Sequence, residues 1–184
     1  MDNDKKSKSN RAARLRVRRG AVPRFPLRLL SLLIRGTCLL PVGAAVAGPQ
    51  GGAVIAGQGT IGQLNDTTTV IHQQSHSLAI DWRSFNLSAG DRVRFEQPSP
   101  SSAVLNRVLS EQPSRILGSI QANGRVFLIN PAGIIFGAGA RVDVGSLVAS
   151  SLHISTSDFM SGIYRFRSAP DRDGGMVVNR GVIQ

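Results

Sequence analysis

The chain has 184 residues and a formal net charge of +11, and 41% of its residues are hydrophobic. Half of its 22 Lys and Arg residues lie within residues 1–47, where the only acidic residues are Asp2 and Asp4. The remaining chain is close to charge balance, so the composition excludes a strongly basic folded body of the kind that binds nucleic acid. Binding of nucleic acid in the cytoplasm by the basic arm alone is left as an alternative interpretation.

Residues 1–47 predict an extended signal peptide. A long basic region precedes the apolar run 29–40, which Arg35 interrupts. Small residues follow, and Ala45 and Ala47 fit the small-x-small rule of a signal peptidase, so we expect the general secretion machinery to export the chain and cleavage before Gly48. The apolar run is short for a membrane span, and an uncleaved anchor is the alternative interpretation.

The predicted cleavage also removes Cys38, the single cysteine of the chain. The mature chain would then be stabilised without disulfides, although it is exported to an oxidising compartment. Residues 48–184 are long enough to bury one hydrophobic core, which predicts one domain.

Short β-branched and apolar segments predict strands in the first half of this body, and no helical pattern of useful length is visible anywhere along the chain. A turn is expected at 88–91 and a loop at 97–102, and residues 110–115 have room for a short helical turn. The expected strands lie at 53–56, 67–73, 78–82, 85–87, 92–96 and 104–108.

The most informative stretch is 118–154, where short apolar segments recur between glycine-containing corners. A chain that bends this often with aliphatic side chains on one side is expected to wind into a β-solenoid, an all-β architecture. The expected corners are 123–124, 131–133, 137–139 and 145. The aliphatic positions are Ile120, Val126, Leu128, Ile134, Phe136, Val142, Val144, Leu147 and Leu152.

The last part of the chain predicts a polar excursion at 155–162, an aromatic strand at 163–166 and an exposed loop at 169–175. Residues 176–183 predict a further coil with a turn at 179–181. A chain that stops within a coil leaves a strand edge bare. We therefore expect either a longer parent protein or a truncated gene product.

The sequence offers no convincing metal, cofactor or catalytic site. His72 and His76 lie four residues apart in a β-branched context, which places them too far apart for one ion. Asp171 and Asp173 are too few carboxylates for a calcium loop. A β-helical carbohydrate-active enzyme or carbohydrate-binding module remains the alternative, and it would require acidic side chains clustered on one sheet.

Several motifs together resemble the secretion domain of filamentous haemagglutinin-type exoproteins that use two-partner secretion, also described as the haemagglutination activity domain. The branch that contains the high-molecular-weight adhesins is the most similar. The resemblance covers about residues 51–184, and the motif at 122–134 is the most specific. The motifs are IDWRSFN at 80–86, VRF at 93–95, AVLNRV at 103–108, SRILG at 114–118, ANGRVFLINPAGI at 122–134 and VGSLVAS at 144–150.

This resemblance implies a right-handed parallel β-helix with an amino-terminal cap and extra-helical β elements. It implies a secretion-targeting and fold-nucleating module of a large adhesin-like exoprotein, with no cofactor and no enzymatic role. The partner would be an outer-membrane β-barrel transporter with periplasmic polypeptide-transport-associated domains. The product would reach the surface or exterior of a Gram-negative bacterium through the periplasm, and a host surface or glycan would be bound only through a longer parent chain.

The resemblance also assigns two motifs. Asn130, Pro131, Gly133 and Ile134 belong to the secretion motif, in which Asn caps a turn, Pro fixes φ and Gly accepts a positive φ. We favour a structural role for this motif over direct contact with the transporter. At Ala132 the family usually carries Asn, and the loss of that amide places the stability of the turn in question.

The second motif is Asn106, Arg107 and Val108. An inward Asn106 would bond to backbone at a corner of a coil. Arg107 is expected to pack along the surface rather than to grip a partner.

Overall fold

The computed structural model describes residues 48–168 and 174–184. The predicted signal peptide, with Ala45 and Ala47, lies outside the described residues, as does most of the exposed loop expected at 169–175.

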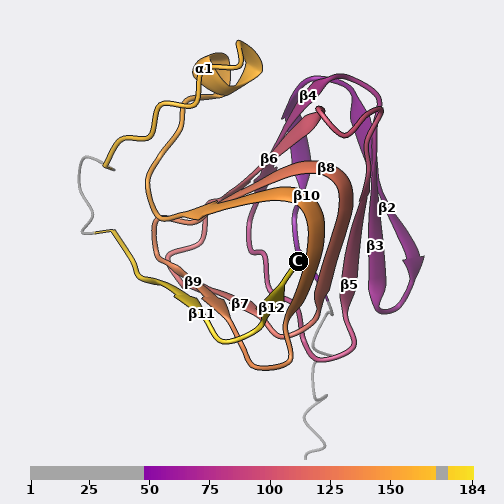
Figure 1. Cartoon of the computed structure of the whole chain (residues 1–184), viewed down its shortest axis with the longest axis vertical. Helices are drawn as coiled ribbons and strands as arrows, with labels where there is room; N and C mark the ends of the chain where they lie inside the picture. The colour runs from indigo at the N-terminus through magenta and orange to yellow at the C-terminus, as the bar shows by residue number, and fades with distance from the viewer. Residues whose placement is uncertain (1–47, 169–173) are drawn as a thin grey trace, which may run out of the picture. The chain divides into compact units, whose positions relative to one another are not determined.

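The strands stack in parallel on three faces, and the chain winds through about three turns of a β-solenoid (Figure 1). The expected parallel β-helix is thereby confirmed. Face 1 contains β3 (Thr68–Gln73), β5 (Arg92–Glu96), the first halves of β8 (Ser119–Ile129) and β10 (Arg141–Ser150), and β12 (Val182–Ile183). Face 2 contains β4 (Ser77–Trp82), β6 (Ala103–Val108) and the second halves of β8 and β10. Face 3 contains β7 (Ser114–Ile116), β9 (Ile134–Phe136) and β11 (Val177–Asn179).

Two antiparallel strands cap the first coil. β1 (Ala53–Ala56) pairs with β4 on face 2, and β2 (Gly59–Asn65) pairs with β3 on face 1. The cap packs closely on the core, because a Cβ on Gly52 would lie 2.4 Å from the ring of Trp82. The cap implied by the family resemblance is therefore present, although residue patterns alone had not indicated β2.

Aliphatic side chains from successive coils lie over one another inside the solenoid. Val93, Ile120 and Val142 occupy aligned positions on face 1, and each is at most 1% exposed. Val104 and Val126 repeat the arrangement on face 2. Burying one such side chain contributes about 1.5–3 kcal/mol, and ordering the backbone of one residue costs roughly 1–2 kcal/mol. The side chains are buried only when neighbouring coils cover them, so only the stacked coils offset this cost. The coils therefore depend on one another for stability.

Two predicted corners are bends within continuous strands, so the expectation of turns there was wrong. β8 runs through Gly124 and β10 runs through Gly145, with a register shift between the two strands at this point. A Cβ on Gly124 would lie 2.8 Å from the carbonyl oxygen of Ser102, and one on Gly145 would lie 3.0 Å from that of Gly124. Glycine is needed here because adjacent backbones approach closely, and this allows the strand to bend without breaking.

Three further local predictions were wrong. The strand expected at 85–87 is reduced to an isolated bridge between Leu87 and Ile116. Residues 110–115 form no helical turn, and their last part enters β7. The aromatic segment 163–166 forms no strand, because its aromatic side chains pack on the outside of the coils and the backbone does not join a ladder.

The residues 151–168, here called the outer segment, cover the outer side of face 2. They leave the end of β10 and contain the short helix α1 (Thr156–Met160) (Figure 1). Phe159 and Tyr164 of this segment pack on Phe127, with ring centroids 5.2 and 4.8 Å from it. The apolar outer side of face 2 is thus buried by a later part of the chain. The cluster comprises Ala79, Ala103, Leu105, Phe127, Ile129, Ile154 and Phe159.

Candidate functional site

Asn130 connects successive coils through a fully buried side chain. It is 0% exposed, and its Nδ2 donates to the carbonyl oxygen of Gln112 at 3.1 Å and to Ser114 Oγ at 3.0 Å. Its Oδ1 accepts from the backbone N–H of Ala132 at 2.9 Å. The Oδ1 atom therefore closes the turn of Asn130 itself, and the Nδ2 atom bonds to the preceding coil.

The rest of this motif lies between two neighbouring segments of backbone. Gly133 has φ of 110°, and a Cβ there would lie 2.8 Å from the carbonyl oxygen of Met176. The carbonyl of Gly133 accepts from Ser114 N at 3.0 Å, and Ile134 N donates to Met176 O at 3.0 Å. The carbonyl oxygen of Pro131 accepts from Gly175 N at 2.8 Å. The motif thus bonds to the backbone of the coil before it and to the segment that precedes β11.

The alanine at position 132 does not open the turn. The N–H of Ala132 bonds to Asn130 Oδ1, and Gly133 N donates to Asn130 O at 2.9 Å. Both bonds depend on Asn130 and on backbone atoms, so they do not require an amide at position 132. The doubt raised by this departure from the family pattern is therefore not supported by the turn geometry.

Asn106 points into the solenoid from the middle of β6, and the expectation that it occupies a corner was wrong. It is 0% exposed, and its Oδ1 accepts from Trp82 Nε1 at 3.0 Å. Its Nδ2 donates to the carbonyl oxygen of Phe127 at 3.3 Å. A single buried amide thus links β4, β6 and β8, and Val108, two residues on, also faces the core at 1% exposure. The bond to backbone was foreseen, whereas the bond to the indole was not.

Arg107 lies on the outer side of the same strand. Its Nε and Nη2 donate to the two carboxylate oxygens of Asp81 at 2.8 and 2.9 Å, a bidentate pair whose side chains are 18% and 19% exposed. Its Nη1 donates to Thr156 Oγ1 at 3.3 Å, at the start of α1. Arg107 therefore links β4 and β6 to the outer segment, which agrees with surface packing rather than a free side chain.

Residue patterns missed a buried pair of glutamines at the corner between faces 1 and 2. Gln97 Nε2 donates to Gln73 Oε1 at 3.1 Å, and Gln73 Nε2 donates to the carbonyl oxygen of Ala103 at 3.1 Å. Gln73 ends β3 and Gln97 follows the last residue of β5, and the residues before them, His72 and Glu96, pair with each other, so the two glutamines occupy equivalent positions in successive coils. That shared position, 24 residues apart, is the signal that could have revealed them.

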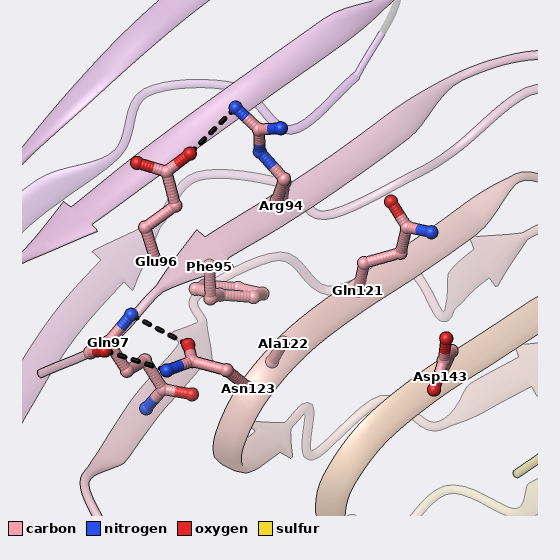
Figure 2. A pocket seen from close by; sticks show the side chains of 8 residues that line it. All are labelled: Arg94, Phe95, Glu96, Gln97, Gln121, Ala122, Asn123 and Asp143. Carbon is pink, nitrogen blue, oxygen red and sulfur yellow. Dashed lines mark hydrogen bonds and ion pairs between the residues drawn. The ribbon is translucent and has the colours of Figure 1, made fainter. Parts of the chain in front are cut away.

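A shallow hollow of about 400 Å³ lies on the outer side of face 1 (Figure 2). Arg94 pairs with Glu96 at 2.6 Å on one side of it, and Asp143 lies beyond Gln121 on the other. Glu96 lies on β5 and Asp143 lies on β10, with β8 between them. Their strands are therefore two strand spacings apart, a total of roughly 10 Å. Glu96 also contacts His72 at 2.5 Å. The hollow does not bring two free carboxylates together.

The histidines do not form a common site. His72 pairs with Glu96, and among residues 48–168 and 174–184 no group of His, Cys, Asp and Glu side chains is arranged to hold a metal ion. Within these same residues, no helix has the length and apolar character needed to cross a membrane.

Two curated relatives are similar to this chain, and both are heme/hemopexin-binding proteins of Haemophilus influenzae, one of them from strain Rd. Each is 35% identical to it, over 153 and 131 residues respectively. The alignments cover 80% and 69% of this chain but only 16% and 14% of those proteins. The chain therefore spans less than a fifth of the length of the curated relatives it matches.

A protein of known structure is also similar to this chain. The crystal structure of the HMW1 secretion domain from Haemophilus influenzae is similar to this chain with a TM-score of 0.69 and 36% sequence identity. The match covers 74% of this chain and 36% of that one.

A family comparison matches residues 45–184 to the TPS secretion domain, where TPS denotes two-partner secretion. Domains of this kind direct the secretion of large exoproteins of Gram-negative bacteria and act with a cognate outer-membrane transporter. This is a family of secretion domains rather than of enzymes, and it does not favour the alternative of a carbohydrate-active enzyme. The chain belongs to the two-partner secretion domain family, in the branch of the high-molecular-weight adhesins.

Proposed function

We propose that this domain is the leading module of a longer adhesin-like exoprotein. Residues 1–47 direct it through the general secretion machinery, and signal peptidase cleaves it before Gly48. An outer-membrane β-barrel then recognises it in the periplasm through polypeptide-transport-associated domains. The observation that carries the proposal is the family match over residues 45–184, supported by the similarity to a secretion domain of known structure.

The interlocked coils support a role in nucleating the fold of a longer exoprotein. Asn106 and Asn130 each bond to atoms of a neighbouring coil, and the cap closes one end of the stack. A coil formed on this stack meets a ready parallel edge, so it avoids the cost of nucleating alone. Any contact with host cells, or with heme-related ligands of the kind named for the relatives, would belong to the longer parent protein.

The test is secretion with and without the cognate barrel. The chain is expressed in a Gram-negative host with the barrel, without it, and with a barrel lacking its periplasmic domains. We expect release into the medium only with the complete barrel, and an amino-terminal sequence that starts at Gly48. Equal release without the barrel would refute recognition by this partner, and a released product that retains residues 1–47 would refute the predicted cleavage.

A further inference from the structure

The carboxylate of Asp91 lies against the backbone nitrogen of Gly48. Asp91 is 3% exposed, and its Oδ2 accepts from Gly48 N at 3.2 Å and from Ser88 N at 2.7 Å. This contact joins residues 43 positions apart in sequence. It connects the beginning of the described chain to the turn that precedes β5.

The backbone of Asp91 is held by its own turn and by the neighbouring coil. The backbone N–H of Asp91 donates to Ser88 O at 3.0 Å, and its carbonyl accepts from Ser119 N at 2.9 Å. The backbone at Gly118 is equally close, because a Cβ there would lie 2.2 Å from the carbonyl oxygen of Asp91. The second and third coils therefore fix the backbone from which the Asp91 side chain extends, and that side chain contacts Gly48 N and Ser88 N.

A buried carboxylate is costly unless a positive charge or several donors satisfy it. Among the described residues, the ion pairs made by Arg and His side chains involve Asp81 and Glu96 but not Asp91. In the uncleaved chain the nitrogen of Gly48 is a neutral amide. Cleavage before Gly48 would turn that same nitrogen into an α-ammonium group, which is positively charged at neutral pH.

We propose that removal of the leader creates an ion pair between the new α-amino group of Gly48 and the buried carboxylate of Asp91. Processing thereby fastens the amino-terminal cap to the second coil and stabilises the folded solenoid. The inference rests on the proposed cleavage before Gly48. It gives the cleavage position a structural consequence, because a product one residue longer or shorter would not place its ammonium group at this nitrogen.

The chain offers a clean test, because residues 48–184 contain no lysine. Acetylation of amines in the exported, processed product therefore modifies only its α-amino group. The acetyl group removes the charge but leaves an N–H donor at Gly48, as in the uncleaved chain. Unfolding in urea is followed by the fluorescence of Trp82, the single tryptophan, which is 1% exposed.

We expect the free-amine form to have an equilibrium ratio of folded to unfolded protein about five- to tenfold higher than the acetylated form. This is the range for a charge-assisted contact that is partly shielded from water. In Asp91→Asn, acetylation should have no effect on the ratio. In the matched control Asp143→Asn, which removes an exposed carboxylate, the effect of acetylation should be unchanged. The comparison in the unmodified sequence needs no variant, so it stands even if Asp91→Asn does not fold.

The outcomes separate this inference from the proposed secretion function. The amino-terminal residue of the product is determined first, and a start other than Gly48 overturns both the cleavage site and the ion pair. If the product starts at Gly48 and acetylation leaves the ratio unchanged, the ion pair is refuted while secretion and cleavage stand. An effect of equal size in Asp91→Asn would likewise overturn the ion pair.

Discussion

Replacing Asn130 with alanine tests whether the secretion motif acts by joining coils. The substitution removes two donated hydrogen bonds and one accepted bond from a side chain that is 0% exposed. Ser114 is also 0% exposed, so its hydroxyl loses a partner that water cannot easily replace. Leaving a buried group unsatisfied costs about 1–3 kcal/mol, and each of the other two bonds contributes about 0.5–1.5 kcal/mol. We therefore expect Asn130→Ala to lower the free energy of unfolding by about 3 kcal/mol.

The matched control is Asn179, which forms the same kind of turn on the surface. Its Oδ1 accepts from Gly181 N at 2.9 Å, and the residue is exposed. Because water can replace that bond, Asn179→Ala should cost less than about 1 kcal/mol. Urea unfolding of the processed product, followed by fluorescence of Trp82, gives both values. Equal losses in the two variants, or a loss below about 1 kcal/mol for Asn130→Ala, would refute the argument from burial and inter-coil bonding.

Three further substitutions address the other contacts, with the same unfolding assay unless stated. Asn106→Leu keeps the volume but leaves the buried indole N–H of Trp82 without its acceptor, so we expect a loss of about 1–3 kcal/mol, and no loss would contradict the role of this amide. Gly133→Ala forces a Cβ into a positive φ next to a backbone carbonyl, and should cost about 1–3 kcal/mol; a neutral result would refute the close approach. Thr156→Val removes the acceptor for Arg107 on α1. Hydrogen exchange should then show faster exchange in the outer segment with the coils unchanged, whereas uniform acceleration would contradict this local role.

Much of the fold could be predicted because one face of each strand is buried. Val93 and Phe95 alternate with exposed arginines in β5, and that period of two fixes both the strand and its inward face. The turn at Asn179 was visible for the same local reason, since an Asn followed by Arg-Gly carries its own side-chain acceptor. These signals lie within a few residues of sequence, so no tertiary information was needed to detect them.

The errors occurred where the decisive contact is distant in sequence. Gly124 and Gly145 were expected at turns, but it is the close approach of a neighbouring coil that requires glycine there. β2 is polar and largely exposed, so its pattern gave no indication that it pairs with β3. Phe166 belongs to an aromatic run that suggested a strand, yet it packs on the outside of face 2. A local pattern cannot distinguish these cases. A turn and a close approach between coils both favour glycine, and a strand and a segment packed on the outside of the coils both favour aromatic residues.

The candidate site was predictable in its residues but not in its geometry. The resemblance indicated Asn106 and Asn130, whereas their partners on other coils could be identified only from the fold. This geometry constrains how the motifs can influence secretion. The amides of Asn106 and Asn130 are fully buried in the folded solenoid and already satisfied by protein atoms, so a transporter can contact them only in a chain that has not yet folded. A secretion defect in a folded, stable variant at either position would therefore indicate recognition of the extended chain. A defect that scales with the loss of stability would instead indicate that secretion depends on the energy released as the coils form.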